Sequence, residues 1–158
     1  MPTTLSPMRR EVFARFAAEA SEAYARDNAL CGRWAAEDAL ANATAEFGQL
    51  LPQGIDTADH FFYEVLDAAA GSVGCVWFGL IGSGASRTGH VYNIRIRPSE
   101  QRKGHGRAAL LALESIAADM QVSAIRLNVF AHNPGAQALY QSLRYQVTSS
   151  SMRKALRT

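Results

Sequence analysis

The sequence has few cysteines and no long apolar run. Its two cysteines, Cys31 and Cys75, lie far apart and form no CxxC pair, so we expect buried free thiols, no metal site and a reducing compartment. No segment approaches the roughly 18 uninterrupted apolar residues of a membrane-spanning helix. The N-terminal residues MPTTLSPMRREVF lack the apolar core of a signal peptide. These absences predict a cytoplasmic protein without a membrane segment.

The chain also lacks an excess of either charge. Its 16 lysines and arginines face 14 acidic residues, which gives a formal net charge of +2. Because the positive and negative charges nearly cancel, the protein creates no overall electrostatic field that would attract nucleic acid or an anionic membrane. Any anion recognition must therefore be local. Neither GxxxxGK[ST] nor GxGxxG occurs, which argues against a P-loop NTPase and a dinucleotide-binding fold.

Helical and strand-like periods alternate along a chain whose 158 residues suit one domain, residues 1–158. Apolar residues at helical spacing predict helices over 9–26, 34–51, 107–120 and 134–145. Runs rich in β-branched and aromatic residues predict strands at 3–8, 60–67, 72–81, 90–97, 124–130 and 145–153. Short links between the second, third and fourth of these strands predict antiparallel hairpins. This order predicts an α/β fold, a three-layer α/β/α sandwich around a mixed, mostly antiparallel sheet.

Residues 101–108, QRKGHGRA, form a basic, glycine-containing loop between an expected strand and an expected helix. Gly104 and Gly106 would let an anion approach the backbone N–H groups at the start of the helix, where the helix dipole is positive. Arg102, Lys103 and Arg107 add positive charge. The loop therefore predicts a phosphate-binding site, and an exposed basic turn is the alternative.

The same loop resembles the Q/R-x-x-G-x-G/A motif of the GCN5-related N-acetyltransferase (GNAT) superfamily, with Gln101, Gly104 and Gly106 in register. A second segment, LNVFAHNPGAQALYQSLRY, resembles the family's later strand-to-helix unit, with Asn133 and Tyr140 at its Asn and Tyr positions. Together the two segments cover roughly residues 89–146. The resemblance implies a splayed GNAT sheet, acetyl-CoA as acyl donor, and a primary amine of a small molecule or a protein as acceptor.

The resemblance also implies roles for individual residues. Tyr140 would donate a proton to the departing thiolate, although its helical spacing also suits a core tyrosine. Asn133 would hydrogen-bond the cofactor, a role that is compatible with an ordinary turn and cap position before the next helix. His132 and His105 occupy no catalytic position of the family, and we expect exposed loop side chains at both. The pyrophosphate would bind the amides of Arg102, Lys103, Gly104, His105, Gly106 and Arg107 beside Gln101, and the pantetheine arm would pair with the backbone of Ile94, Arg95 and Ile96.

The acceptor side departs from the family pattern. Many relatives carry carboxylates where this sequence has Tyr92 and Asn93, which leaves Glu64, His90, the Tyr92 phenol or water to take the acceptor's proton. An exposed, structural role is at least as well supported for Glu64. A second departure is Arg144, where the family commonly has glycine. The candidate acceptor residues are Tyr24, Arg33, Trp34, Trp77 and Tyr92, and each of these aromatic side chains also suits the core.

Three functional classes remain open at this point. The first is an acetyl-CoA-dependent N-acetyltransferase. The second is a coenzyme A binding module of the same fold that acts as a sensor or partner protein, which the missing carboxylates favour. The third, a nucleic-acid binder, is disfavoured because the cations cluster in one loop without interleaved aromatic residues. The sequence leaves open the acceptor, the acyl chain and whether the protein forms a homodimer.

Overall fold

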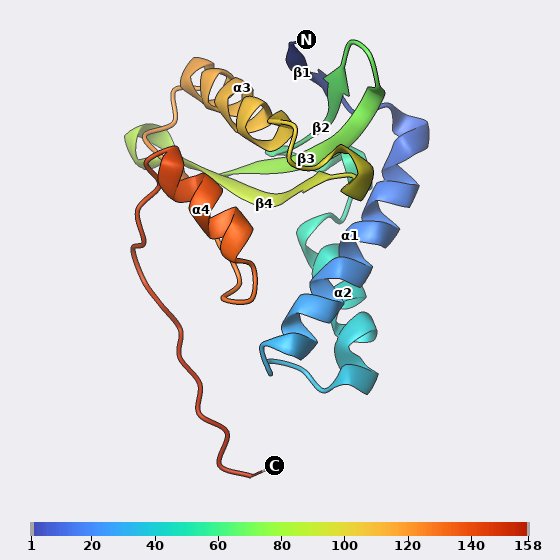
Figure 1. The fold of residues 1–158 in the computed structure, drawn as a ribbon, viewed down its shortest axis with the longest axis vertical. Helices are drawn as coiled ribbons and strands as arrows, with labels where there is room; N and C mark the ends of the chain where they lie inside the picture. Colours follow the sequence, from blue (N-terminus) through green and yellow to red (C-terminus); the bar gives the residue numbers. More distant parts are fainter. Residues whose placement is uncertain (1, 158) are drawn as a thin grey trace.

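A five-stranded sheet organises the fold, with helices on both of its faces (Figure 1). The computed structural model describes residues 2–157. The sheet contains β1 (Thr3–Pro7), β2 (His60–Asp67), β3 (Gly71–Ile81), β4 (Thr88–Ile96) and β5 (Ile125–Leu127). The helices are α1 (Arg10–Leu30), α2 (Ala36–Leu50), α3 (His105–Asp119) and α4 (Pro134–Ser142), with short 3₁₀ turns at Gly54–Asp56, Gly84–Ser86 and Pro98–Glu100.

The strands lie in sequence order, β1-β2-β3-β4-β5. The first four are antiparallel neighbours, as short hairpins require, and β5 lies parallel to β4 after the α3 crossover. The predicted mixed, mostly antiparallel sheet is therefore confirmed. None of the helices in residues 2–157 is long and apolar enough to cross a membrane.

Two apolar clusters form the layers on either side of the sheet. One joins α3 to the sheet through Leu113 and Ala117, which pack with Val65, Val76 and Phe78. The other joins α1 to the opposite face and contains Met8, Phe16, Ala20, Leu51, Phe62 and Trp77. The sheet is thus buried on both sides, as the three-layer prediction requires.

The predicted final strand over 145–153 is wrong for this chain. Residues 146–157 form neither helix nor strand and leave α4 as an extended segment (Figure 1). β5 is also shorter than predicted, with three residues in the sheet. A strand forms only where a neighbouring strand supplies hydrogen-bond partners. β5 pairs with β4 at three positions, and residues 146–157 pair with no strand among the described residues.

Two predictions about single side chains also need correction. Cys31 and Cys75 are free thiols, but neither belongs to the fully buried residues. Cys75 is half-buried on β3, and Cys31 is exposed because it lies at the C-terminal cap of α1, in the turn toward α2. His105 is buried, with 7% of its surface exposed, because it opens α3 on the side that faces β1. Its Nδ1 lies 2.9 Å from the Thr3 hydroxyl oxygen.

Candidate active site

The sheet opens between β4 and β5. These strands pair at only three positions, the last of which is Val91 with Leu127. Beyond that point, residues 92–96 of β4 have no partner strand on this side within the described chain. The predicted pantetheine residues Ile94, Arg95 and Ile96 all lie on this unpaired stretch, where the backbone can accept an extended ligand as an added strand.

A β-bulge marks the point where the opening begins. Trp77 of β3 pairs with Asn93 and Phe78 pairs with Val91, so Tyr92 is the extra residue on β4. Tyr92 stacks on Trp77 with ring centroids 4.6 Å apart, and Asn93 is the register partner of the same Trp77. The bulge therefore turns both Tyr92 and Asn93 toward the α1–α2 face of the sheet.

Asn93 is a candidate site residue, which the sequence indicated only as the replacement of a carboxylate that many relatives carry. Its Oδ1 is buried and has no hydrogen-bond partner among residues 2–157. A buried amide oxygen without a partner is costly, and such groups concentrate where a ligand or water completes the bonding. In the sequence, the role of Asn93 could have been found only from the break in strand alternation at Tyr92-Asn93.

Arg95 makes a second contact that the sequence did not indicate. Its guanidinium Nη1 lies 3.6 Å from Oε2 of Glu19 on α1, and both side chains are about half exposed. The pair places a carboxylate beside the unpaired part of β4. Glu19 appeared in the sequence only as part of the polar face of a helix.

The loop before α3 presents backbone donors, as predicted. Gly104 caps the helix with φ +88°, a conformation that glycine adopts without strain, and Arg102 also has a positive φ of +64°. The first helical hydrogen bond runs from Ala108 N–H to Gly104 O at 3.1 Å. Within the described chain, the N–H groups of residues 102–107 donate to no backbone acceptor. Free donors at the positive end of a helix are the arrangement that the predicted phosphate-binding site requires.

Side chains of the loop hold its shape. Gln101 donates from Nε2 to Ile96 O at 3.0 Å and so ties the loop to the end of β4. Lys103 pairs with Glu100 at 3.2 Å, and Arg107 reaches Ser142 Oγ of α4 at 3.3 Å. A Cβ on Gly106 would lie 3.4 Å from Leu139 of α4, so glycine here lets the two helices approach closely. Because the His105 ring faces β1, only its N–H is available to a ligand.

Tyr140 lies on α4 beside Tyr145, with the two rings edge to face at 5.8 Å. Burial raises the pKa of the Tyr140 phenol above its usual value, so the hydroxyl is protonated at neutral pH and can donate a proton. Asn133 caps α4, because its Oδ1 accepts from Ala136 N–H at 3.1 Å. The capping role predicted for Asn133 is therefore confirmed. His132 is exposed, as predicted, and lies 2.8 Å from Asp27.

The candidate acceptor aromatics are connected to one another. Tyr24 lies edge to face with Trp34 at 5.6 Å, and Phe47 links Tyr24 to Trp77 at 5.8 and 5.1 Å. Trp77 is only 1% exposed and belongs to the core, so its indole is not available to a ligand. Tyr92, which stacks on Trp77, is half-buried, so part of its side chain is accessible. The Arg33 guanidinium lies over the Trp34 ring and donates hydrogen bonds to the Tyr24 hydroxyl and to Glu46. These contacts fix the positions of Tyr24 and Trp34.

Glu64 is structural, and it is buried rather than exposed. Arg9 donates to it from Nε at 2.9 Å, from Nη2 at 3.0 Å and from its backbone N–H at 3.2 Å. These bonds lower the pKa of Glu64 and occupy both of its oxygens. His60 is also engaged, since its Nδ1 accepts from Trp77 Nε1 at 2.9 Å. His90 faces Tyr92 at 4.5 Å, and burial and Arg126 lower its pKa. Unlike His60, His90 makes no hydrogen bond to a neighbouring side chain among the described residues, and its lowered pKa favours the neutral ring.

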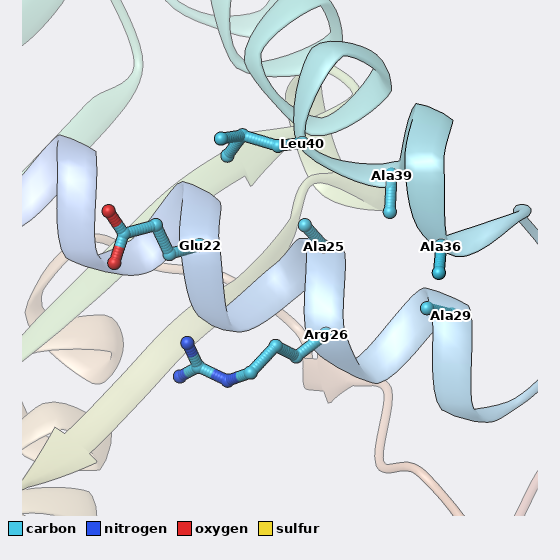
Figure 2. Close-up of a pocket in the computed structure, with 7 residues that line it drawn as sticks. All are labelled: Glu22, Ala25, Arg26, Ala29, Ala36, Ala39 and Leu40. Carbon is cyan, nitrogen blue, oxygen red and sulfur yellow. The ribbon is translucent and has the colours of Figure 1, made fainter.

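A separate groove of about 350 Å³ lies between α1 and α2 (Figure 2). Alanines of both helices form its floor, and Glu22, Arg26 and Leu40 lie along it. None of its lining residues belongs to β4, to the loop before α3 or to α4. It is therefore distinct from the opening of the sheet.

Comparison with known proteins identifies this arrangement. Residues 30–145 match the family model described as the acetyltransferase (GNAT) family. The chain belongs to the GNAT acetyltransferases. Two relatives from Bacillus subtilis (strain 168), named as the uncharacterized N-acetyltransferases YycN and YdgE, are 30% and 27% identical to it. Each similarity covers 99% of this chain, and 100% and 99% of the relatives.

Solved structures agree with this assignment. The crystal structure of YycN has a TM-score of 0.94 to this chain at 29% identity, with 99% of each chain covered. A more distant structure, AAC(6')-Iy in complex with the bisubstrate analog CoA-S-monomethyl-acetylneamine, matches with a TM-score of 0.58 and 12% identity, and the match covers 100% of both chains. At that identity the likeness concerns the fold. The GNAT membership expected from the loop motif and the later strand-to-helix unit is confirmed.

Proposed function

We propose that this GNAT enzyme transfers the acetyl group of acetyl-CoA to a primary amine. The observation that carries the proposal is the combination of an unpaired β4 edge at residues 92–96 with free N–H groups at residues 102–107. The first suits the amide-containing pantetheine arm and the second suits a pyrophosphate. The CoA-linked bisubstrate analog bound by AAC(6')-Iy supports the choice of acyl donor.

The chain's own residues divide the chemistry between them. A backbone N–H near Ile94 polarises the thioester carbonyl as charge develops on its oxygen. Tyr140, whose buried phenol has a raised pKa and stays protonated at neutral pH, gives its proton to the leaving thiolate. The acceptor enters on the α1–α2 face, where Tyr92, Asn93 and the Glu19–Arg95 pair lie. The free Oδ1 of Asn93 accepts a hydrogen bond from the amine.

Thiol release from acetyl-CoA in the presence of a panel of amines tests the proposal. The panel contains small polyamines, amino acids, aminoglycosides and peptides with a free α-amine or a lysine. We expect release that depends on one class of amine. Acetyl-CoA that raises the melting temperature without any amine-dependent release would instead support the binding module, which the lack of a free carboxylate on β4 favours.

A further inference from the structure

The C-terminal tail, residues 146–157, is extended but pairs with no strand in the described chain. Its backbone groups make no hydrogen bond within the described chain. Three apolar side chains of the tail lie in solvent, with Val147 74%, Met152 94% and Leu156 86% exposed. Figure 1 shows the tail running away from the sheet beyond α4. Extended backbone and exposed apolar side chains together mark an element without its partner.

The tail's sequence suits a strand. It contains no glycine or proline, and Val147-Thr148 is a β-branched pair. Fully extended, residues 146–157 span about 40 Å. The tail can therefore reach well beyond the body of its own chain, and within that chain Arg153 already lies against Gly32 at the far end of α1.

The outer edge of β5 is an unpaired sheet edge to which such a strand could add. Gly89 N–H donates to Ala124 O, so alternation along the strand turns the N–H and C=O groups of Ile125 and Leu127 away from β4. No strand among residues 2–157 covers them. The other edge strand, β1, is a poorer template because it packs against α3 and ends in Pro7, which has no N–H to donate.

We propose that the tail of each chain adds as a strand to the outer edge of β5 in a second copy, forming a two-fold symmetric, strand-exchanged dimer. Each copy carries both a free edge and a free strand, so a two-fold axis satisfies both chains at once. Exchange also covers the exposed apolar side chains of the tail. The proposal concerns assembly and is independent of the acetyl-transfer reaction.

Proline substitution in the tail tests the exchange without disturbing the body of the chain. Successive N–H groups of a strand point to opposite sides, so T148P/S149P removes one donor toward the partner whichever way the tail faces. The matched control is T148A/S149A, which keeps both donors. Light scattering after size exclusion should give twice 17.1 kDa for the wild type and the alanine pair, and 17.1 kDa for the proline pair.

Amide hydrogen exchange separates pairing between chains from pairing within one chain. Amides of the tail and of β5 should be protected at concentrations where the wild type is a dimer and should lose protection on dilution to the monomer. A wild type that is monomeric at all concentrations overturns the proposal, as does a proline pair that remains dimeric through another surface, such as the α1–α2 groove. Tail protection that persists in the monomer would overturn it too, since the tail would then pair with its own sheet.

Discussion

Tyr140 and Tyr145 lie in contact, yet removal of their hydroxyl groups should have different effects. Tyr140→Phe should lower kcat by about 10²-fold or more while leaving the dissociation constant for coenzyme A nearly unchanged, because only the transition state needs the proton. Steady-state kinetics with calorimetric titration of coenzyme A measure both quantities.

Tyr145→Phe is the matched control for this substitution. Its hydroxyl is buried without a partner in the described chain, and burial with nearby Glu114 raises its pKa to about 12. Removing such a group should be neutral or stabilising and should leave turnover within a few-fold of wild type. Equal turnover in Tyr140→Phe would make Tyr140 a core residue only.

Glu64 supports stability rather than catalysis. Glu64→Gln should lower the free energy of unfolding by about 1–3 kcal/mol, because the buried side chain can no longer pair with Arg9 as an ion. Since Arg9 lowers the pKa of Glu64 in the folded chain, its stabilisation is present above the unfolded-state pKa and is lost as pH falls through the lower folded-state pKa.

The difference in stability between wild type and Glu64→Gln should therefore disappear in acid, which urea unfolding at several pH values measures. Asp56→Asn is the control, because the Arg10–Asp56 pair is exposed on both sides and should contribute little. Loss of acetyl transfer by folded Glu64→Gln at neutral pH would contradict the structural role.

At the scale of elements, the start of α3 should bind the pyrophosphate of acetyl-CoA. Gly106→Glu places a side chain and a negative charge beside the free N–H groups, so acetyl-CoA should no longer raise the melting temperature. Gly48→Glu adds the same charge on the exposed face of α2, where a Cβ meets nothing within 4 Å, and should keep the full shift. An unchanged shift in Gly106→Glu would refute the anion site.

Elements with strong local signals were predictable from the sequence. The β2-β3-β4 hairpins have regular strand periods, and the loop before α3 combines glycine with cations, so both appear as expected. The bulge at Tyr92 did not, because it breaks the alternation on which strand prediction depends. Glu64 was misplaced for a related reason: alternation gives two faces of β2 but does not show that Arg9, far away in sequence, covers one of them.

The predicted final strand shows a further limit of local prediction. Val147 and Thr148 favour extended backbone, but a strand also needs an edge to pair with, and the tail pairs with no strand of the described chain. Whether such a segment becomes a strand is decided by assembly. The local sequence pattern therefore predicted the structure of the loop before α3 better than that of the end of the chain.

At the scale of the whole molecule, we expect the proposed acetyl transfer to remove the acceptor's proton without a dedicated carboxylate. An ammonium group cannot attack a thioester until it loses its proton. Glu64 is occupied by Arg9, Glu19 is paired with Arg95, and burial raises the pKa of Tyr92, which keeps its phenol neutral. His90 remains, next to the last paired position of β4 and β5. The arrangement favours deprotonation through water in the sheet opening.

The pH dependence of kcat/KM should therefore follow the acceptor. With an α-amine of pKa near ~8 and a lysine-like amine near ~10.4, the ascending limb should shift with the amine. Because burial and Arg126 lower the pKa of His90, a histidine base would instead give one limb below the usual histidine pKa for both amines. The water route would be excluded if the ascending limb stays at the same pH for both amines. If His90→Ala then abolishes that limb while Glu19→Gln retains it, His90 is the base.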